Sequence, residues 1–390
     1  MEELFLSILR QAITPDGTSG DTLSLSLSSE QLNAVASLAQ RHGVAPLIYN
    51  ELLKQPEGVN PEAVNYMRQV CVGTMMTQQR QLQVLTQTVK ALQATEDKAA
   101  TAVLLKGFSL AQLYPLPYLR AWGDLDIYVG PAYYHQAAAV LRETYPDAIH
   151  HDEEWEELKH YCFILPDGNV IEMHRRTMAL TGKKDNEVFC PLEEQAMREP
   201  AFIDVNGLSV AIPEAKFNML FVFMHAWEHF YESGVGLKQL SDVALLCQQS
   251  QGVEGMEAYL SNALTKLHLL EPWQLVGYFL HKALHLPKEQ WWLYSDSRRI
   301  QRLGERFYKK VMQEGLMRHV LKEGELNRYQ KREKAHQMNV LLRKMVTLYG
   351  RVQSTMPMLK VCPRYAWHHL LMQIKKGIHR TVHREKMLDY

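Results

Sequence analysis

Two short segments of the chain carry acidic side chains at the alternating spacing of a β-strand. The first, GDLDIYV at 123–129, places Asp124 and Asp126 two residues apart. Because successive side chains of a strand point to opposite faces, both carboxylates face one side and the apolar residues between them face the other. Neighbouring carboxylates on a half-buried strand repel each other unless a cation neutralises them. Mg²⁺, or Mn²⁺ in its place, fits because hard ions prefer oxygen ligands and substrate phosphates.

The second segment, VIEMH at 170–174, places Glu172 and His174 on one face of a strand. If this strand lies beside the Asp strand, Glu172 joins Asp124 and Asp126. Three carboxylates can hold two divalent ions, one activating an attacking hydroxyl and the other stabilising a leaving pyrophosphate. His174 is then a candidate for lining the substrate cleft. The structural alternative for Glu172 is an ion pair with an arginine of the core such as Arg175.

A strand, a sharp turn and a short helix are predicted at LLKGFS, residues 104–109. Gly107 lets the backbone approach a phosphate closely, and Lys106 supplies a point charge suited to a triphosphate. Arg120 is a second candidate cation for nucleotide binding. The structural alternatives are a surface lysine at a strand end and, for Arg120, an ion pair with Asp124.

The elements around these segments indicate an α+β fold. Helices are predicted through most of residues 1–98, including one capped by Ser28 or Ser29 and a long one over 62–92. A small α/β unit follows, with a strand, a short helix, a strand over 125–129, a helix over 131–145 and a hairpin turning at Pro-Asp-Gly-Asn. A last strand is predicted at 206–213, and helices continue from there. We therefore expect an N-terminal helical region (1–98), a small mixed-sheet core (99–210) and a C-terminal helical region (211–390).

The bulk composition narrows the classes of partner. Among 390 residues, Lys+Arg and Asp+Glu are each 43, so no global field draws the chain onto nucleic acid or an anionic membrane. A long nucleic-acid substrate is disfavoured for the same reason. The five cysteines are odd in number and widely spaced, which argues against a disulfide framework and a cysteine-based zinc site. There is no apolar run near 18 residues and no signal-peptide pattern, so we expect a cytoplasmic protein that makes no use of the membrane.

The succession LLKG, LY-P-LR, GDLDIYV and VIEMHRR resembles the family of uncharacterised bacterial nucleotidyltransferases within the polymerase-beta-like superfamily. The likeness extends to RHGVAPLIYNELL at 41–53 and to PEAKFNMLFVFMHAWEH with LKQLSDVALL, so it covers about residues 1–250. By this resemblance Asp124 and Asp126 match the paired metal-binding carboxylates and Glu172 the third. Gly107 and Ser109 match the glycine-serine turn of the superfamily, although Phe108 stands between them and the Asp pair follows later than usual.

The resemblance implies a small nucleotidyltransferase-type sheet core flanked by helices. It implies a metal-dependent enzyme that transfers a nucleoside monophosphate from an NTP to an acceptor hydroxyl and releases pyrophosphate. The acceptor stays open among a small molecule, a sugar, a protein and an RNA end. One alternative is a protein that binds nucleotide for regulation or interaction without catalysis.

A second alternative comes from His225-Ala226-Trp227-Glu228-His229, which matches the inverted zinc-peptidase pattern on a helix. A zinc hydrolase would need a third ligand from elsewhere, and the apolar character of this helix favours buried, hydrogen-bonded histidines. Lining of the substrate cleft by His225 is the use that we favour.

Overall fold

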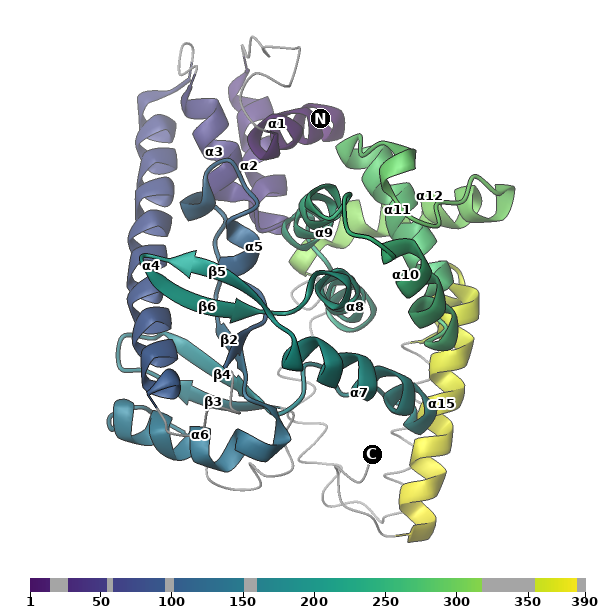
Figure 1. Cartoon of the computed structure of the whole chain (residues 1–390). Coiled ribbons are helices and arrows are strands. Elements are labelled where there is room, and N and C mark those ends of the chain that lie inside the picture. Colours follow the sequence, from purple (N-terminus) through teal and green to yellow (C-terminus); the bar gives the residue numbers. More distant parts are fainter. Residues whose placement is uncertain (15–26, 55–58, 95–101, 151–159, 318–354, 384–390) are drawn as a thin grey trace, which may run out of the picture. The chain divides into compact units, whose positions relative to one another are not determined.

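The computed structural model describes residues 1–14, 27–54, 59–94, 102–150, 160–317 and 355–383 (Figure 1). The chain divides into two compact units. The first takes residues 1–179, 190–222 and 241–253, and the second takes residues 180–189, 223–240 and 254 onward. This division rests on proximity in space, and the organisation into regions 1–98, 99–210 and 211–390 stays a prediction.

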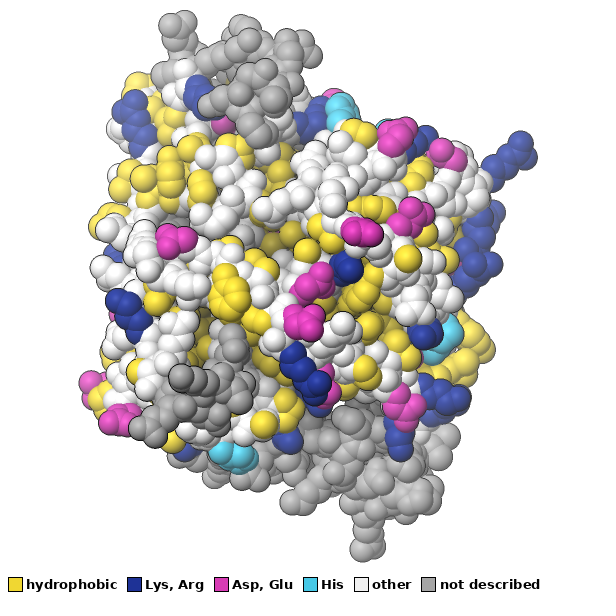
Figure 2. All heavy atoms as spheres, in the orientation of Figure 1, with side chains coloured by type: hydrophobic (Ala, Val, Ile, Leu, Met, Phe, Trp, Pro, Cys, Tyr) yellow, Lys and Arg dark blue, Asp and Glu magenta, His cyan; other side chains and the backbone are white. Residues whose placement is uncertain are grey.

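The first unit begins with four helices, α1 (Glu2–Ile13), α2 (Ser29–Arg41), α3 (Ala45–Leu53) and α4 (Pro61–Gln93). Ser28 caps α2 through a reciprocal capping box with Gln31, as its position before the apolar periodicity predicted. α4 exposes several large apolar side chains, and Figure 2 shows apolar side chains gathered at the upper left, where α3 and α4 run. Those on α4 are Tyr66, Val72, Met75 and Met76.

A mixed sheet of six strands follows in the order β3-β4-β2-β1-β6-β5. Its strands are β1 (Val103–Leu104), β2 (Leu125–Tyr128), β3 (His160–Ile164), β4 (Val170–His174), β5 (Ala201–Val205) and β6 (Leu208–Ile212). β2 runs parallel to β4 and antiparallel to β1, while β1 runs parallel to β6. The hairpin β3–β4 and the strand near 206–213 agree with the sequence prediction, and β5 is an addition to it.

The two faces of β2 and β4 differ as side-chain alternation predicted. Leu125, Ile127, Ile171 and Met173 are buried in a core that includes residues of α4 and of α6 (Gly130–Thr144). At the alternate positions Asp126, Tyr128, Glu172 and His174 are polar and point to the other face. The short helices α5 (Phe108–Ala111) and η1 (Pro117–Leu119) lie in the chain between β1 and β2. A mixed sheet with helices on one face agrees with the expected α+β class.

The second unit is helical among its described residues. It contains residues 223–232 of α8 (Ala215–Glu232), the start of α9 (Leu237–Gln249) and the first turns of α7 (Lys183–Arg198). Further along are α10 (Met256–Lys266), α11 (Leu270–Leu284), η3 (Lys288–Gln290), α12 (Arg298–Glu314), η4 (Gly315–Met317) and α15 (Pro363–His383). Its core is aromatic, with Trp227, Phe230 and Phe279 each within ring contact of Phe307. Among the described residues, no helix is long and apolar enough to cross a membrane.

Candidate functional site

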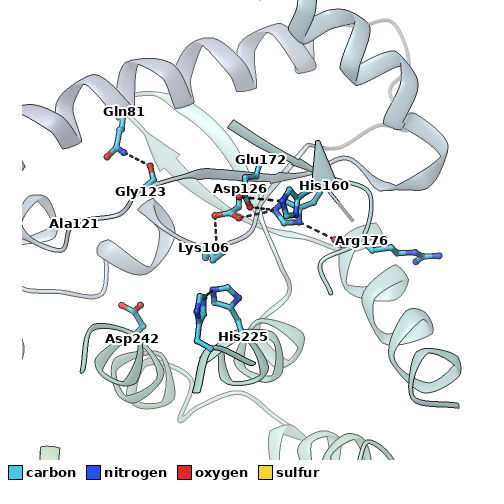
Figure 3. Close-up of polar contacts among 12 residues, drawn as sticks. Gln81, Lys106, Ala121, Gly123, Asp126, His160, Glu172, Arg176, His225 and Asp242 are labelled. Carbon is cyan, nitrogen blue, oxygen red and sulfur yellow. Dashed lines mark hydrogen bonds and ion pairs between the residues drawn. The ribbon is translucent and has the colours of Figure 1, made fainter. Parts of the chain in front are cut away.

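Asp126 and Glu172 lie side by side on the polar face of the sheet. The parallel register of β2 and β4 pairs Asp126 with Glu172 and Tyr128 with His174 (Figure 3). The side chain of Asp126 is 2% exposed and that of Glu172 is 21% exposed, so the first carboxylate is nearly enclosed and the second reaches solvent. The hairpin strand β4 therefore lies beside the Asp strand β2, which is the arrangement that brings the two acidic segments together.

His174 bridges the two carboxylates. Its Nε2 lies 3.0 Å from Asp126 Oδ1 and 3.4 Å from Glu172 Oε2, and its Nδ1 lies 3.3 Å from the backbone carbonyl of Arg176. Because a carbonyl oxygen only accepts, Nδ1 is assigned a proton in this contact; Nε2 donates to the carboxylates when it too is protonated, and offers its lone pair to a cation when it is not. The Nε2 atom is therefore the one presented to Asp126 and Glu172, which fixes the ring's orientation at the site.

Lys106 supplies the positive charge closest to Asp126. Its Nζ lies 2.9 Å from Asp126 Oδ2. Burial alone would raise the pKa of Asp126, but Lys106 and His174 outweigh it and hold that pKa well below its usual range. Burial lowers the pKa of Lys106, and the charges of Asp126, Glu172 and Asp124 outweigh it and leave that pKa raised. The pair is therefore ionised, and the surface-lysine alternative for Lys106 does not describe its position.

Asp124 is not among the three possible metal ligands grouped at this cluster. It is exposed and precedes the first residue of β2. The group of possible metal ligands found here among the described residues consists of Asp126, Glu172 and His174. The charge of Asp124 still reaches the site, since it contributes to the raised pKa values of Lys106 and Cys162. Its role as a metal ligand stays a prediction.

A second group of possible ligands shares Glu172. The antiparallel register of the hairpin pairs Cys162 with Glu172 and His160 with His174. His160, Cys162 and Glu172 present ligand atoms within 4.8 Å of one another, and His160 Nε2 lies 3.7 Å from Glu172 Oε1. Sequence reasoning missed His160 and Cys162. A hairpin symmetric about the predicted turn 166–169 would pair residues whose numbers sum to 335, which is one residue off the observed register. In the structure Leu165 lies opposite Asn169, so paired residues sum to 334 and Cys162 meets Glu172.

The backbone before β2 is anchored by α4. Gln81 donates from Nε2 to the carbonyl of Gly123 at 2.5 Å (Figure 3). Gln78 donates to the carbonyl of Trp122 at 3.4 Å. Both glutamines are buried. These bonds satisfy carbonyls that no strand partner reaches and hold the start of β2 against the helix. The two hydrogen bonds fix the position of the backbone from which Asp124 and Asp126 follow.

The predicted turn after β1 is present. Gly107 has φ +72°, a conformation that favours glycine, and α5 begins at the next residue. A methyl group added at Gly107 would contact Trp122 at an ordinary 3.4 Å, so the backbone conformation and not space requires the glycine. The Ser109 hydroxyl is buried and has no hydrogen-bond partner among the described residues. An oxygen of a bound ligand would satisfy it.

Arg120 is engaged in a buried ion pair. Its Nε lies 3.0 Å from Asp242 Oδ1 on α9, and a second guanidinium nitrogen contacts the other carboxylate oxygen. The Tyr114 hydroxyl also donates to Asp242, at 2.8 Å. This geometry favours the structural alternative for Arg120, with Asp242 as partner in place of Asp124. Nucleotide binding by Arg120 stays a prediction.

The end of β4 is held by a carboxylate that sequence reasoning missed. Glu193 on α7 is fully buried and accepts hydrogen bonds from the Thr177 backbone N–H at 2.6 Å and from the Thr177 hydroxyl at 2.5 Å. Arg176 donates to Glu193 and Glu194 at 2.9 and 3.1 Å. The network fixes the Arg176 carbonyl that orients His174. A glutamate within an amphipathic helix carries no sequence signal for this use.

A cavity of about 410 Å³ opens beside the turn. Phe108 and Trp122 line it from the side of the turn, and Met75 and Met76 line it from α4. Its polar lining includes three glutamine side chains, Gln78, Gln79 and Gln112. The cavity is therefore suited to an apolar or aromatic group.

His225 and His229 contact each other within the second unit. Their Nε2 atoms are 3.1 Å apart, and His229 Nδ1 lies 3.2 Å from the Ser233 hydroxyl. Among the described residues, no group of three possible metal ligands includes this pair. The geometry gives the zinc-hydrolase alternative no third ligand, and the place of His225 in a substrate cleft stays a prediction.

The donor set at Asp126, Glu172 and His174 fits a divalent cation. It offers two carboxylates and one imidazole nitrogen within 4.8 Å, with Asp124 next to the strand. Carboxylate oxygens suit Mg²⁺, and the imidazole makes Mn²⁺ equally acceptable. The site can thus hold a cation beside a phosphate chain.

Comparison with known proteins gives one family. A family model described as an uncharacterised nucleotidyltransferase matches residues 28–285, which include all six strands of the sheet and the helices from α2 to α11. Neither a curated protein nor a solved structure matches the chain.

Proposed function

The chain belongs to this family of uncharacterised nucleotidyltransferases, and on that premise we propose that it transfers a nucleoside monophosphate from an NTP to an acceptor hydroxyl in a divalent-metal-dependent reaction. The observation that carries the proposal is the pairing of Asp126 with Glu172 across adjacent parallel strands, beside a turn that contains Gly107. Two carboxylates side by side repel each other, and Lys106 and His174 offset part of that repulsion in the structure.

Asp126, Glu172 and Asp124 are the residues that would hold Mg²⁺ or Mn²⁺. When bound, the ions neutralise charge on the triphosphate and lower the pKa of the acceptor hydroxyl. Glu172, the more exposed of the two paired carboxylates, accepts the proton of that hydroxyl. The acceptor oxygen forms a bond to the α-phosphorus, the bond from that phosphorus to the bridging oxygen breaks, and pyrophosphate leaves with the electron pair.

Lys106, Gly107 and Ser109 would bind the triphosphate. Lys106 would turn from Asp126 to the phosphate oxygens, since a cation held at Asp126 would neutralise that carboxylate. Gly107 allows the close approach of the backbone, and the buried Ser109 hydroxyl gains the partner that it lacks among the described residues. These interactions position the phosphates for in-line attack, and positioning with charge neutralisation supplies most of the rate in phosphoryl transfer.

The acceptor class stays open among small molecules, sugars and proteins. The net charge of zero argues against a long nucleic acid. The apolar cavity lined by Phe108, Trp122 and Met75 is the place where an acceptor with an aromatic or aliphatic portion would bind.

Calorimetric binding of each NTP, with Mg²⁺ or Mn²⁺ and with chelator, tests the proposal. The variants are Asp126→Asn and Glu172→Gln, and Glu143→Gln on the exposed face of α6 is the matched control. We expect metal-dependent binding of one or more NTPs to the wild type and to Glu143→Gln, and its loss in Asp126→Asn. Equal binding by Asp126→Asn and wild type would refute the assignment of this site.

Release of pyrophosphate separates transfer from binding alone. The wild type incubated with a bound NTP and pooled small-molecule or protein acceptors is expected to release pyrophosphate, and Glu172→Gln to bind the NTP without releasing it. Metal-dependent NTP binding with no pyrophosphate release by either protein would favour the regulatory nucleotide-binding alternative.

A further inference from the structure

Three segments of the second unit bring two imidazoles and one carboxylate together. Asp185 lies in the first turn of α7, His268 follows the end of α10, and His368 lies in the second turn of α15. Ligand atoms of the three residues lie within 4.8 Å of one another. From this geometry we propose that Asp185, His268 and His368 form a site for a divalent transition metal, with Zn²⁺ as the ion that it takes.

The contacts within the cluster already converge. His368 Nε2 lies 3.4 Å from Asp185 Oδ2, and the ring centroids of His268 and His368 are 4.0 Å apart with an interplanar angle of 34°. Each side chain comes from a different element of the unit (Figure 1). A cation bound between them needs only the small adjustments that bring three donors to about 2.0–2.2 Å from Zn²⁺.

The backbone at His268 is in the left-handed region, as it also is at His285. Its φ is +58°, and the turn makes the two hydrogen bonds of a Schellman motif, from His268 N–H to the Thr265 carbonyl and from Leu269 N–H to the Leu264 carbonyl. Glycine is the usual residue at this position because side chains are strained in the left-handed region. A histidine here has a structural cost that a role for its imidazole explains.

The position of the Asp185 carboxylate depends on Gly182. A methyl group at Gly182 would overlap the Asp185 carboxylate and lie 3.1 Å from Met372 Sδ of α15. Asn186 fixes this turn, since its side chain accepts from Leu180 N–H and donates to the Gly182 carbonyl at 3.0 Å. Gly182 therefore leaves the space in which the carboxylate reaches α15.

The chemistry of the donors selects the ion. Two imidazole nitrogens and one carboxylate oxygen are a Zn²⁺ donor set, whereas Mg²⁺ prefers oxygen ligands and retains its water. Three protein ligands leave a fourth position for water, and the bound ion joins α15 to α7 and to the turn after α10.

The test measures Zn²⁺ affinity of the chelator-treated full-length protein. A Glu172→Gln/His160→Gln background breaks both groups of possible ligands in the first unit, so that the readout reports on the second unit. His268→Gly is the decisive variant, because glycine keeps the left-handed turn and removes the ligand. His368→Ala removes a second ligand, and Gly182→Ala displaces Asp185 while all three ligands remain in the chain. His369→Ala is the matched control, since His369 packs on Tyr231 and Tyr365.

We expect one tight Zn²⁺ equivalent in the background and in His369→Ala, weakened at least about tenfold in His268→Gly, His368→Ala and Gly182→Ala. In chelator, His268→Gly has an unchanged or higher Tm, and Zn²⁺ raises the Tm of the background but not of this variant. Co²⁺ gives a spectrum without sulfur-to-cobalt charge transfer. The proposal is wrong if the background binds no Zn²⁺, if His268→Gly binds it equally well, or if loss of His225 removes it instead. The site shares no residue with the proposed nucleotide site, so the two proposals fail separately.

Discussion

Replacement of Lys106 by methionine tests how much the Lys106–Asp126 ion pair contributes to the free energy of unfolding. In the structure Lys106 Nζ lies 2.9 Å from Asp126 Oδ2, and the Asp126 side chain is 2% exposed. Methionine keeps the length and apolar stem of lysine and removes its charge. Asp126 then keeps His174 as its neighbour with positive character and loses the ammonium group.

The expected loss of stability follows from the burial of Asp126. Removing one partner of a buried ion pair costs about 3–5 kcal/mol, because the remaining charge stays buried without compensation. Lys106 is 22% exposed and His174 stays at 3.0 Å from Asp126, which moderates the loss. We therefore expect the free energy of unfolding to fall by about 3 kcal/mol at pH 7, the lower end of that range.

The pH dependence has a defined sign. Lys106 and His174 hold the folded-state pKa of Asp126 below its ordinary value of 3.8, so the stabilisation is complete above that value and is lost as the pH falls toward the folded-state pKa. Without Lys106 the folded-state pKa rises, and acid removes less stability from the variant. The difference between wild type and Lys106→Met is thus largest at neutral pH and narrows below about pH 5.

Urea unfolding in the presence of chelator, at several pH values, measures the effect. Lys90→Met on the exposed surface of α4 is the control and is expected to change stability by less than about 0.5 kcal/mol. A loss by Lys106→Met no larger than that of the control, or a loss that stays constant from pH 7 to acid, would refute the reasoning on the Lys106–Asp126 pair.

Three further changes probe other parts of the first unit. Asp242→Asn leaves Arg120 buried without its counter-charge and is expected to cost about 3–5 kcal/mol in urea unfolding, and a cost below about 1 kcal/mol would contradict the ion pair. Gly107→Ala is expected to cost about 1–2 kcal/mol by the same method because of its φ of +72°, whereas Gly73→Ala in the exposed interior of α4 is expected to stabilise. Burial and neighbouring carboxylates raise the pKa of Cys162 to about 11. Its alkylation at pH 8, followed by mass spectrometry, should therefore be roughly a hundredfold slower than that of an ordinary thiol. An ordinary rate would contradict the position of Cys162 beside these carboxylates.

Local chemistry was enough to predict the strands and turns that carry the candidate site. Alternation of side chains separated Asp126 from Leu125 and Ile127 before any neighbour of the strand was known. The turn residues 166–169 predicted the hairpin, and Gly107 marked the turn after β1. Each of these features depends on a few consecutive residues, so a single sequence contains the information. The family match over 28–285 agrees with the resemblance drawn from the same segments.

Contacts between distant residues were beyond such reasoning. Arg120 pairs with Asp242, and nothing in the composition of either segment distinguishes that partner from Asp124. The buried Glu193 lies on a helix that gave no strong local signal, and it stabilises the end of β4. The Lys106–Asp126 pair needed the antiparallel pairing of β1 and β2, which no local pattern specifies. In each case the tertiary fold decides between partners that the sequence leaves equivalent.

The pairing of β1 with β6 has a consequence for how the protein is made. β1 bonds on one side to β2, which follows it closely in the chain, and on the other side to β6 at Ala211. On the ribosome, a nascent chain that ends before Leu208 therefore has Val103 and Leu104 at an open sheet edge, with unpaired backbone groups and apolar side chains. An open edge of this kind pairs readily with strands of other chains. Pairing of β1 with β6 is slow because the two strands are far apart in the sequence. Expression of fragments that stop short of β6 is for this reason expected to yield aggregates, whereas fragments that include β5 and β6 can complete the sheet.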